Sequence, residues 1–411
     1  MINQPWTVST KIGFRFAFIF ILSFILFKNN GAFPFVQYIM QPLMPPLRKL
    51  VHWFSSHILD YPYDYAIYTN GSGDTSYDWV SLVFFLVLAV LGTVIWSVLD
   101  RDRKSYNTCY YWLTAITRYY IAFMLINYGV IKLTHSQMPP PGLGRLMQPL
   151  GEFSPMGLAW TYFGYSAGYN IFVGMVEIFA GFLLFRRTMV LGALITMTVS
   201  INIMTTNYFF DVPVKIVATA LFALSLFLLL PHIRPLLALL IQGKPAQLHV
   251  VAKPVYAKPW KNKLMIGVKV FVLLIFLIQQ VSGLLNRHKL MDHYFKKSAL
   301  YGIYRVEDNA AERTIIPKDW MSIVFEYEGH ASVRDKYYQK TALEAKINPG
   351  DKTISLNNYT LDYTVLENGD IMLMKSFEDR TEVVKLVKQK PEEFELRKRE
   401  FNWIQEYPYN R

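Results

Sequence analysis

Two charged side chains inside apolar segments are the residues of this 411-residue chain whose chemistry most needs an explanation. Ionisable groups inside a bilayer are costly, and they are usually either paired or functional. Counted from segment ends near Tyr110 and Arg186, Arg118 and Glu177 lie at a similar depth of about 12–14 Å, at ~1.5 Å per helical residue. We therefore expect Arg118 and Glu177 to form an ion pair, which either fastens two helices together or takes part in function.

A second group of polar residues gathers toward the other end of the same segments. It consists of Lys132, Asn202, Asn207, Asp211 and Lys215. Lys132 follows Arg118 by close to four helical turns, so the two share a helix face and are expected to line one outward-opening cavity. Asp211 either caps the helix that begins near Pro213 or pairs with Lys215 four residues on. The alternative for Lys132 and Lys215 is that their long side chains only reach the membrane surface.

Histidine and cysteine usage excludes several kinds of redox site. All eight histidines fall outside the centres of the apolar segments, so a haem held by two buried histidines is not expected. His288 and His293 flank Asp292, but a spacing of five does not align them on one helix face, and we expect no metal there. The single cysteine, Cys109, cannot support an intramolecular dithiol mechanism.

Long apolar segments must position these groups. Val80 to Leu99 holds twenty residues without a charge, which on a helix matches the ~30 Å hydrocarbon thickness of a bilayer. Seven segments of this kind predict an α-helical multi-pass membrane bundle. The predicted spans are 12–28, 77–99, 110–133, 169–185, 188–207, 213–231 and 264–285.

The distribution of lysine and arginine predicts the orientation of the chain. Basic residues are concentrated in the links before the first span, between the second and third, between the fourth and fifth, and in the long link 232–263. This bias places the N-terminus in the cytoplasm and everything after the seventh span outside it. The formal net charge of +12 is explained in this way, so we expect the lipid bilayer and not nucleic acid as the partner.

The last part of the chain has the pattern of a small antiparallel β-rich domain, either a sandwich or a barrel. Turn sequences separate alternating segments at Asn348-Pro349-Gly350-Asp351 and at Asn368-Gly369-Asp370. An interfacial helix is expected over 286–299, and the proline-rich, aromatic loop 134–168 is expected to lie on the bundle surface. The domain shows no catalytic motif, so docking or packing is its expected role. The strand-like runs are 301–306, 321–327, 341–347, 353–356, 360–366, 371–374 and 382–387.

The motifs of residues 110–231 resemble those of the DoxX family of small four-helix membrane proteins. The matching residues are Arg118, Gly129-x-x-Lys132 and Gly174-x-x-Glu177-x-x-x-Gly181-x-Leu183-Leu184. The chain is more similar to larger bacterial members with extra N-terminal helices and a C-terminal extension. The resemblance implies a bacterial cytoplasmic (inner) membrane protein. Some members are subunits of thiosulfate:quinone oxidoreductase or other redox complexes, and more distant relatives act in assembly or as chaperones.

These observations give a domain organisation and two functional hypotheses. The first hypothesis is a subunit or accessory of a quinone-linked redox process, with a quinone as the cofactor, none bound covalently, and a redox subunit as partner. The alternative is a non-enzymatic assembly or chaperone protein whose β-domain binds an exported client; whether the chain is an enzyme stays open. The expected regions are 1–109 with two spans, 110–231 as the DoxX-like core, 232–263 as a basic linker, 264–299 as the seventh span with its interfacial segment, and 300–411 as the β-rich domain.

Overall fold

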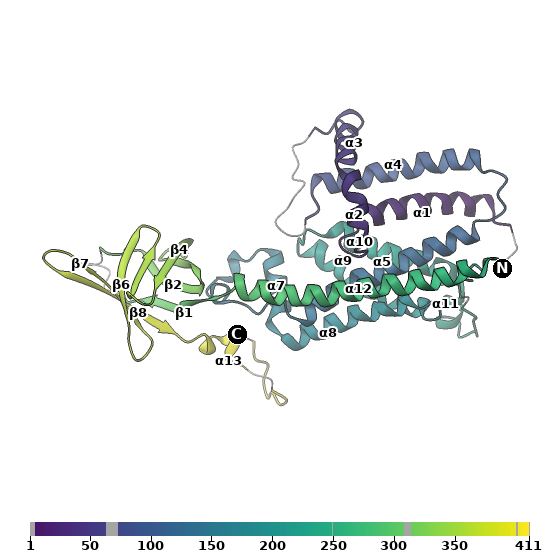
Figure 1. Cartoon of the computed structure of the whole chain (residues 1–411). Helices are drawn as coiled ribbons and strands as arrows, with labels where there is room; N and C mark the ends of the chain where they lie inside the picture. Colours follow the sequence, from purple (N-terminus) through teal and green to yellow (C-terminus); the bar gives the residue numbers. More distant parts are fainter. Residues whose placement is uncertain (1–4, 63–72, 249, 308–313, 400–401, 411) are drawn as a thin grey trace. The chain divides into compact units, whose positions relative to one another are not determined.

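The computed structural model describes residues 5–62, 73–248, 250–307, 314–399 and 402–410 (Figure 1). The chain divides into two compact units, each described here by itself. The first comprises Met1–Met138 and Ser154–Gly283, and the second comprises Pro139–Phe153 and Leu284–Arg411. The short segment Pro139–Phe153 therefore belongs with the C-terminal domain, whereas we expected the whole loop 134–168 to lie on the bundle.

The first unit is helical. Its helices are α1 (Val8–Phe27), α2 (Val36–Met40), η1 (Gln41–Leu43), α3 (Met44–His57), α4 (Ser76–Leu99), α5 (Asn107–Leu133), α7 (Pro155–Tyr165), α8 (Ala167–Ile178) continued by η3 (Phe179–Leu184), α9 (Met189–Phe209), α10 (Lys215–Leu229) continued by η4 (Leu230–His232) and α11 (Ile233–Leu240), and the part of α12 (Pro259–Tyr294) up to Gly283. Along the bundle, α1 packs on α4, α5 packs on α8 and η3, and α9 packs on α10 and η3.

Six of these helical stretches, among the described residues, are long and apolar enough to cross a membrane. They are Val8–Phe27, Ser76–Leu99, Ala167–Leu184, Met189–Phe209, Lys215–Leu240 and Pro259–Met291. The third expected span forms α5, a 27-residue helix that is less apolar because it carries Arg118, Lys132 and many tyrosines and threonines. The architecture is that of a multi-pass membrane protein, while the count of seven and the sides of the two termini stay predictions.

The segment expected to be an interfacial helix over 286–299 is helical up to Tyr294, but as the continuation of α12 and not as a separate helix, and strand β1 begins at Lys297. The polar residues after 285 favour water over lipid around this part of the helix. None of them up to Tyr294 is a proline or glycine that would end the helix. The change to polar residues after 285 was therefore mistaken for the end of a helix.

The helix ends are fastened by polar contacts. Thr75 caps α4 in a reciprocal arrangement with Asp78, whose carboxylate accepts a hydrogen bond from the Thr75 backbone N–H. The other oxygen of Asp78 lies 2.6 Å from the Nζ of Lys28, the residue that ends α1. The Lys28 carbonyl in turn accepts a hydrogen bond from the buried hydroxyl of Tyr120. These contacts fix α1, α4 and α5 against one another at one end of the bundle.

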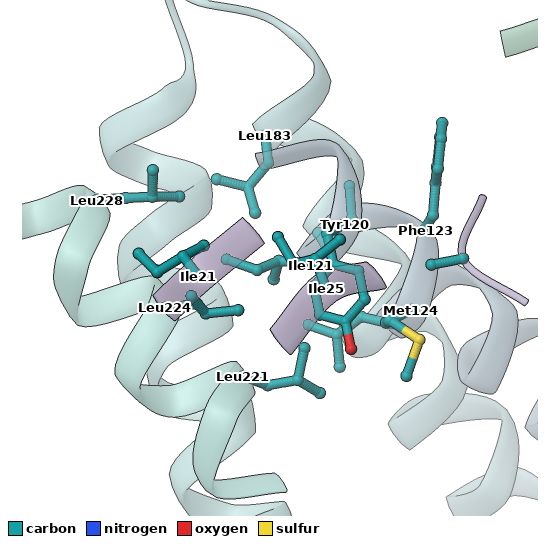
Figure 2. Close-up of a cluster of buried hydrophobic side chains, with 14 of the residues drawn as sticks. Ile21, Ile25, Tyr120, Ile121, Phe123, Met124, Leu183, Leu221, Leu224 and Leu228 are labelled. Carbon is teal, nitrogen blue, oxygen red and sulfur yellow. The ribbon is translucent and has the colours of Figure 1, made fainter. Parts of the chain in front are cut away.

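The core of the bundle is built around the middle of α5 (Figure 2). Tyr120, Ile121, Phe123 and Met124 are fully buried there, so this helix presents apolar side chains on nearly its whole circumference. Figure 2 shows α5 side chains meeting Ile21 and Ile25 of α1, Leu183 of η3, and Leu221, Leu224 and Leu228 of α10. A helix apolar on all sides belongs in the interior of a bundle, which places α5 at its centre.

The second unit contains a closed antiparallel barrel of eight strands in meander order. The strands are β1 (Lys297–Val306), β2 (Trp320–Tyr327), β3 (Gly329–Asp335), β4 (Lys340–Asn348), β5 (Thr353–Leu356), β6 (Tyr359–Val365), β7 (Ile371–Ser376) and β8 (Thr381–Gln389). Closure comes from β1 pairing with β8, from Ile303 opposite Gln389 to Val306 opposite Leu386. Of the two β architectures expected from the sequence, the structure is the barrel.

Seven of the eight strands were expected, and both expected turns join hairpins. Gly369 adopts φ +85° between β6 and β7, a conformation that favours glycine. The strand missed from the sequence is β3, whose polar pattern includes Arg334. Arg334 is buried because its guanidinium makes a two-pronged contact with Glu152, at 2.8 and 2.9 Å. A buried arginine held by a partly exposed glutamate thus replaces the apolar side chain that would have identified the strand.

Candidate functional site

A cavity of about 500 Å³ lies between α5, α7, α8, α9 and α10 in the first unit. This volume is within the range of small-molecule sites in proteins. Helical spacing explains which side chains reach it: Met156, Trp160 and Phe163 share one face of α7, and Asn202 and Thr206 lie one turn apart on α9. The remaining lining residues are Tyr128, Lys132, Gln137, Met138, Val173, Glu177, Ile203, Asn207, Val212, Pro213, Val214, Val217, Ala218 and Leu221.

An ion pair between Lys132 and Glu177 forms part of the cavity wall. Both carboxylate oxygens of Glu177 lie 2.8 Å from the Lys132 Nζ, and the two residues are 5% and 1% exposed. Only Oε2 is aligned to accept a hydrogen bond from the ammonium, while Oε1 is buried without a hydrogen bond. The pair is therefore electrically neutral but keeps acceptor capacity at Oε1.

The expected pair between Arg118 and Glu177 is wrong. The Nε of Arg118 instead donates to the Leu183 carbonyl at 2.7 Å, and Glu177 is taken by Lys132. Side chains on a helix tilt toward its N-terminus, which directs Arg118 away from Glu177. The six residues of η3 also form a 3₁₀ helix, which rises about 2.0 Å per residue instead of about 1.5 Å. Glu177 thus lies farther from that end of the bundle than a uniform α-helix predicts.

The expected single cavity lined by both Arg118 and Lys132 is also wrong. The two residues lie about 21 Å apart along α5 at ~1.5 Å per residue, and they line different cavities. Between them α5 and α8 approach so closely that a Cβ added to Gly129 would lie 2.6 Å from the Gly174 carbonyl oxygen. The two glycines therefore leave little room for a continuous space between the helices.

Asp211 and Lys215 do not line the cavity. Their side chains form an ion pair at 3.0 Å, as one of the two expectations for Asp211 required, and Asp211 is 80% exposed. The expected cap is absent, since α10 begins at Lys215 and its Ile216 N–H donates to Asp74 at 2.9 Å. Burial raises the pKa of Asp74 above its usual range, despite that hydrogen bond.

Two amides hold the walls of the cavity in place. Asn170, which is 1% exposed, donates to the carbonyl oxygens of Met138 and Phe163 and so joins α8 to α7 and to the end of the loop after α5. Asn207 donates to the Val214 carbonyl at 2.9 Å and closes the turn between α9 and α10. Asn207 thus shapes the site, while Asn202 is free to contact a ligand.

Several polar side chains on the cavity wall have no hydrogen-bond partner within the described part of the chain. These are the Tyr128 hydroxyl, the Gln137 carbonyl oxygen, the Trp160 N–H, the Asn202 amide and the Thr206 hydroxyl. Of these groups only the Gln137 oxygen is fully buried, and the others are partly or largely exposed. Free donors and acceptors on the wall of a largely apolar cavity are typical of a binding site. Sequence reasoning missed all but Asn202, because each is common at membrane interfaces and only the fold brings them together.

The sequence predicts no metal site at the two histidines and one aspartate near the end of α12. The side chains of His288, Asp292 and His293 lie outside the described residues. Elsewhere in the described ranges, no group of three or more histidine, cysteine, aspartate or glutamate side chains could hold a metal ion.

Comparison with known proteins gives one relative. Over 120 residues the chain is 37% identical to the uncharacterized protein YwoB of Bacillus subtilis (strain 168), and the match covers 28% of this chain and 75% of that protein. No family model and no solved structure matches the chain.

Proposed function

Because the chain belongs to the family of Bacillus subtilis YwoB, whose name assigns no activity, we propose its function from the cavity beside Lys132 and Glu177. The chain binds a quinone there, as a subunit or accessory of a quinone-linked redox process. The observation that carries this proposal is the set of unpartnered polar side chains on the wall of an otherwise apolar space of about 500 Å³.

The donor and acceptor set fits a quinone ring. A quinone needs hydrogen-bond donors at its two carbonyl oxygens, and the Trp160 N–H, the Asn202 amide and the Thr206 hydroxyl are free to donate. The reduced form carries hydroxyl groups and needs acceptors, which the Asn202 amide oxygen and the hydroxyl oxygens of Thr206 and Tyr128 provide. The wall from α10, formed by Val217, Ala218 and Leu221, is apolar, as a flat ring and an isoprenoid tail require.

The Lys132–Glu177 pair gives this site a way to hold a proton. The third N–H of the Lys132 ammonium is not needed by the carboxylate, and it can donate to a ligand oxygen. The proton is held on the Lys132 ammonium, which lies 2.8 Å from both carboxylate oxygens of Glu177. A bound quinone would supply the two-electron acceptor, and the protein would orient it and hold the proton nearby.

We place the entrance to the cavity at α9, because its lining residue Asn202 is exposed. The neighbouring Ile201 on the outer surface of the same helix is also exposed. In a bilayer this surface of α9 contacts lipid, because the helix is long and apolar enough to span it. A lipid-soluble ligand can therefore enter sideways, without passing through water.

The resemblance to the DoxX family and a bacterial cytoplasmic membrane location belong to the same proposal. They rest on the motifs around Arg118, Lys132 and Glu177, and they agree with a redox role. The alternative, an assembly or chaperone protein, has less support from the barrel. Its strands pair in a closed ring, so an exported client could not be added as a further strand to a free edge.

Fluorescence quenching of Trp160 tests the proposal. A short-tailed quinone titrated into the full-length protein in lipid nanodiscs should quench tryptophan emission with a saturable component, and Trp160→Phe should remove that component. Thr206→Val should weaken binding roughly 3–10-fold, the value of one hydrogen bond. Thr205→Val is the matched control, because the Thr205 hydroxyl bonds the Asn202 carbonyl and does not line the cavity. Quenching that is unsaturable and identical in Trp160→Phe would contradict quinone binding here.

A further inference from the structure

A second cavity of the helical unit, about 380 Å³, runs along α5 and α12 beside η3. Four cationic residues line it: Arg118, Arg186, Lys253 and Lys269. Within the described part of the chain, none of the four forms an ion pair with a carboxylate, and no acidic residue lines this cavity. The site thus concentrates positive charge that the protein itself does not neutralise.

Arg118 forms the buried part of this cationic group. It is 3% exposed, and its only hydrogen bond among the described residues is the one from Nε to the Leu183 carbonyl oxygen. Its two terminal Nη nitrogens are left free to bind an anion in the fork geometry that suits phosphate. A buried guanidinium with both terminal nitrogens free is costly unless a ligand satisfies it.

The other three cations gather around Arg118. The Nη1 of Arg186 lies 3.4 Å from the Val251 carbonyl oxygen, and the Nζ of Lys269 lies 3.5 Å from the Leu184 carbonyl oxygen. Arg118, Arg186 and Lys269 are close enough to repel one another. The carbonyl end of η3 offers the equivalent of about half a negative charge, which does not balance four positive charges.

The polarity of the cavity changes along its length. Arg186 comes just after the end of η3, and Lys253 comes shortly before the start of α12. Farther along, the lining consists of Ile116, Val272 and Phe33, which are apolar. On the outer side, Trp112 is 38% exposed and Ile266 is 56% exposed, so the cavity is open toward the membrane.

We propose that this cavity binds an anionic phospholipid, with its phosphate on Arg118 and the surrounding cations and an acyl chain along Ile116, Val272 and Phe33. The basic end and the apolar end match the two ends of such a lipid, and the opening at Trp112 gives it access from the bilayer. This site is separate from the quinone cavity and does not depend on it.

Native mass spectrometry of the full-length protein tests the proposal. Protein released from nanodiscs of equal parts phosphatidylglycerol and phosphatidylcholine should retain one phosphatidylglycerol in preference. The double variant Arg118→Met, Lys269→Met should reduce that retention about ten-fold or more, since two charge-assisted contacts are lost. Arg118→Lys keeps a charge but not the fork, and it should retain more lipid than the double variant.

Adjacent arginines provide the matched control. Arg186→Gln should weaken retention of phosphatidylglycerol, whereas Arg187→Gln should not, because Arg187 does not line the cavity. Equal retention of the two lipids by the wild type, or equal effects of Arg186→Gln and Arg187→Gln, would overturn the proposal. A separate arm adds inorganic phosphate to lipid-free protein in detergent. Tight, Arg118-dependent phosphate binding there would identify a free anion as the ligand and refute the role of the acyl chain.

Discussion

The helical unit and the barrel differ in what they do with buried charge. In the helical unit, Lys132 and Glu177 pair beside a cavity, and Arg118 keeps two nitrogens free beside another. In the second unit, Arg334 is held by Glu152, and Glu326 accepts hydrogen bonds from the backbone N–H groups of Leu143 and Gly144. The helical unit therefore leaves hydrogen-bonding groups free for ligands. In the second unit the charged side chains of Arg334 and Glu326 hold the loop segment Pro139–Phe153 on the barrel.

This contrast separates a binding region from a supporting one. The interior of the barrel is filled by side chains such as Phe325, Ile354 and Leu373, which are fully buried. A small cavity beside Gly144 and Arg334 holds about 10 Å³, the lower limit for a single water. Ligand chemistry is therefore expected in the helical unit, and mutations in the barrel should change stability without changing ligand affinity.

The largest expected effect comes from breaking the buried ion pair. Glu177→Gln should destabilise the full-length protein in detergent by about 3–5 kcal/mol, because the Lys132 ammonium is left buried without its counter-charge. The double variant Glu177→Gln, Lys132→Met should recover much of that loss. Unfolding in increasing denaturant measures both. Recovery by Arg118→Met in place of Lys132→Met would mean that Arg118 is the true partner of Glu177.

The close contact of α5 and α8 should be the next most sensitive feature. Gly129→Ala places a Cβ 2.6 Å from the Gly174 carbonyl oxygen, so the two helices must separate. Overpacking of this kind costs about 1–3 kcal/mol, and it should also change the shape of the quinone cavity. Gly181→Ala is the matched control, since its added Cβ meets its nearest atom at 4.0 Å. Equal thermal stability of the two variants would show that the helices are not in this contact.

A smaller effect is expected where the loop meets the barrel. Glu326→Gln should cost about 1–2 kcal/mol, because a neutral amide replaces a carboxylate that accepts two backbone N–H groups, at 2.8 and 3.0 Å. Glu328→Gln removes only an exposed pair with Lys296 and should cost at most about 0.5 kcal/mol. Hydrogen exchange of the Leu143 and Gly144 amides reports the difference directly. Quinone affinity should stay the same in both variants, and a loss in Glu326→Gln would break the separation of the two units' roles.

Low pH should lower the stability of the barrel slightly. The backbone N–H of Lys388, which donates to Asp370 at 2.8 Å, holds the pKa of that carboxyl below its usual range. Because the folded pKa lies below the unfolded value near 4, the carboxylate stabilises the barrel above that pH. The contribution is lost as the pH falls through the folded pKa. Asp370→Asn should therefore flatten the pH dependence of barrel hydrogen exchange below pH 5, and an unchanged profile would exclude Asp370 as the cause.

The sequence predicted elements better than it predicted contacts. Apolar length identified the long helices but not α3 and α7, which are shorter and carry proline in their first turn. Alternation with turn residues identified seven of the eight strands, because both patterns are local along the chain. Lys132, Glu177, Asn202 and Asn207 were singled out as polar residues in apolar surroundings, and the structure places all four on one cavity. The partner of Glu177 was predicted wrongly, since it depends on the 3₁₀ geometry of η3 and on the direction of the Arg118 side chain.

Contacts between residues that are far apart in the chain could not be predicted from the sequence. Asp74 reaches the start of α10 across 142 positions of the chain, and no local pattern connects the two. Trp160 and Thr206 resemble ordinary interface residues until helices α7 and α9 bring them to the same cavity. The cations around Arg118 come from three separate stretches of the chain. Arg186 and Lys253 lie in basic links, which suggested only topology, and Lys269 lies inside the predicted span 264–285 and was missed.

Photochemical labelling tests most directly whether the helical unit carries the ligand site. A quinone analogue with a photoreactive group on its ring would be bound to the full-length protein in nanodiscs, irradiated, and its attachment sites mapped by peptide mass spectrometry. Labels should fall in peptides of α5, α7 and α9 near Tyr128, Trp160 and Asn202, and excess unlabelled quinone should suppress them. Labels confined to the barrel, or labels in the helices that excess quinone does not suppress, would contradict the account.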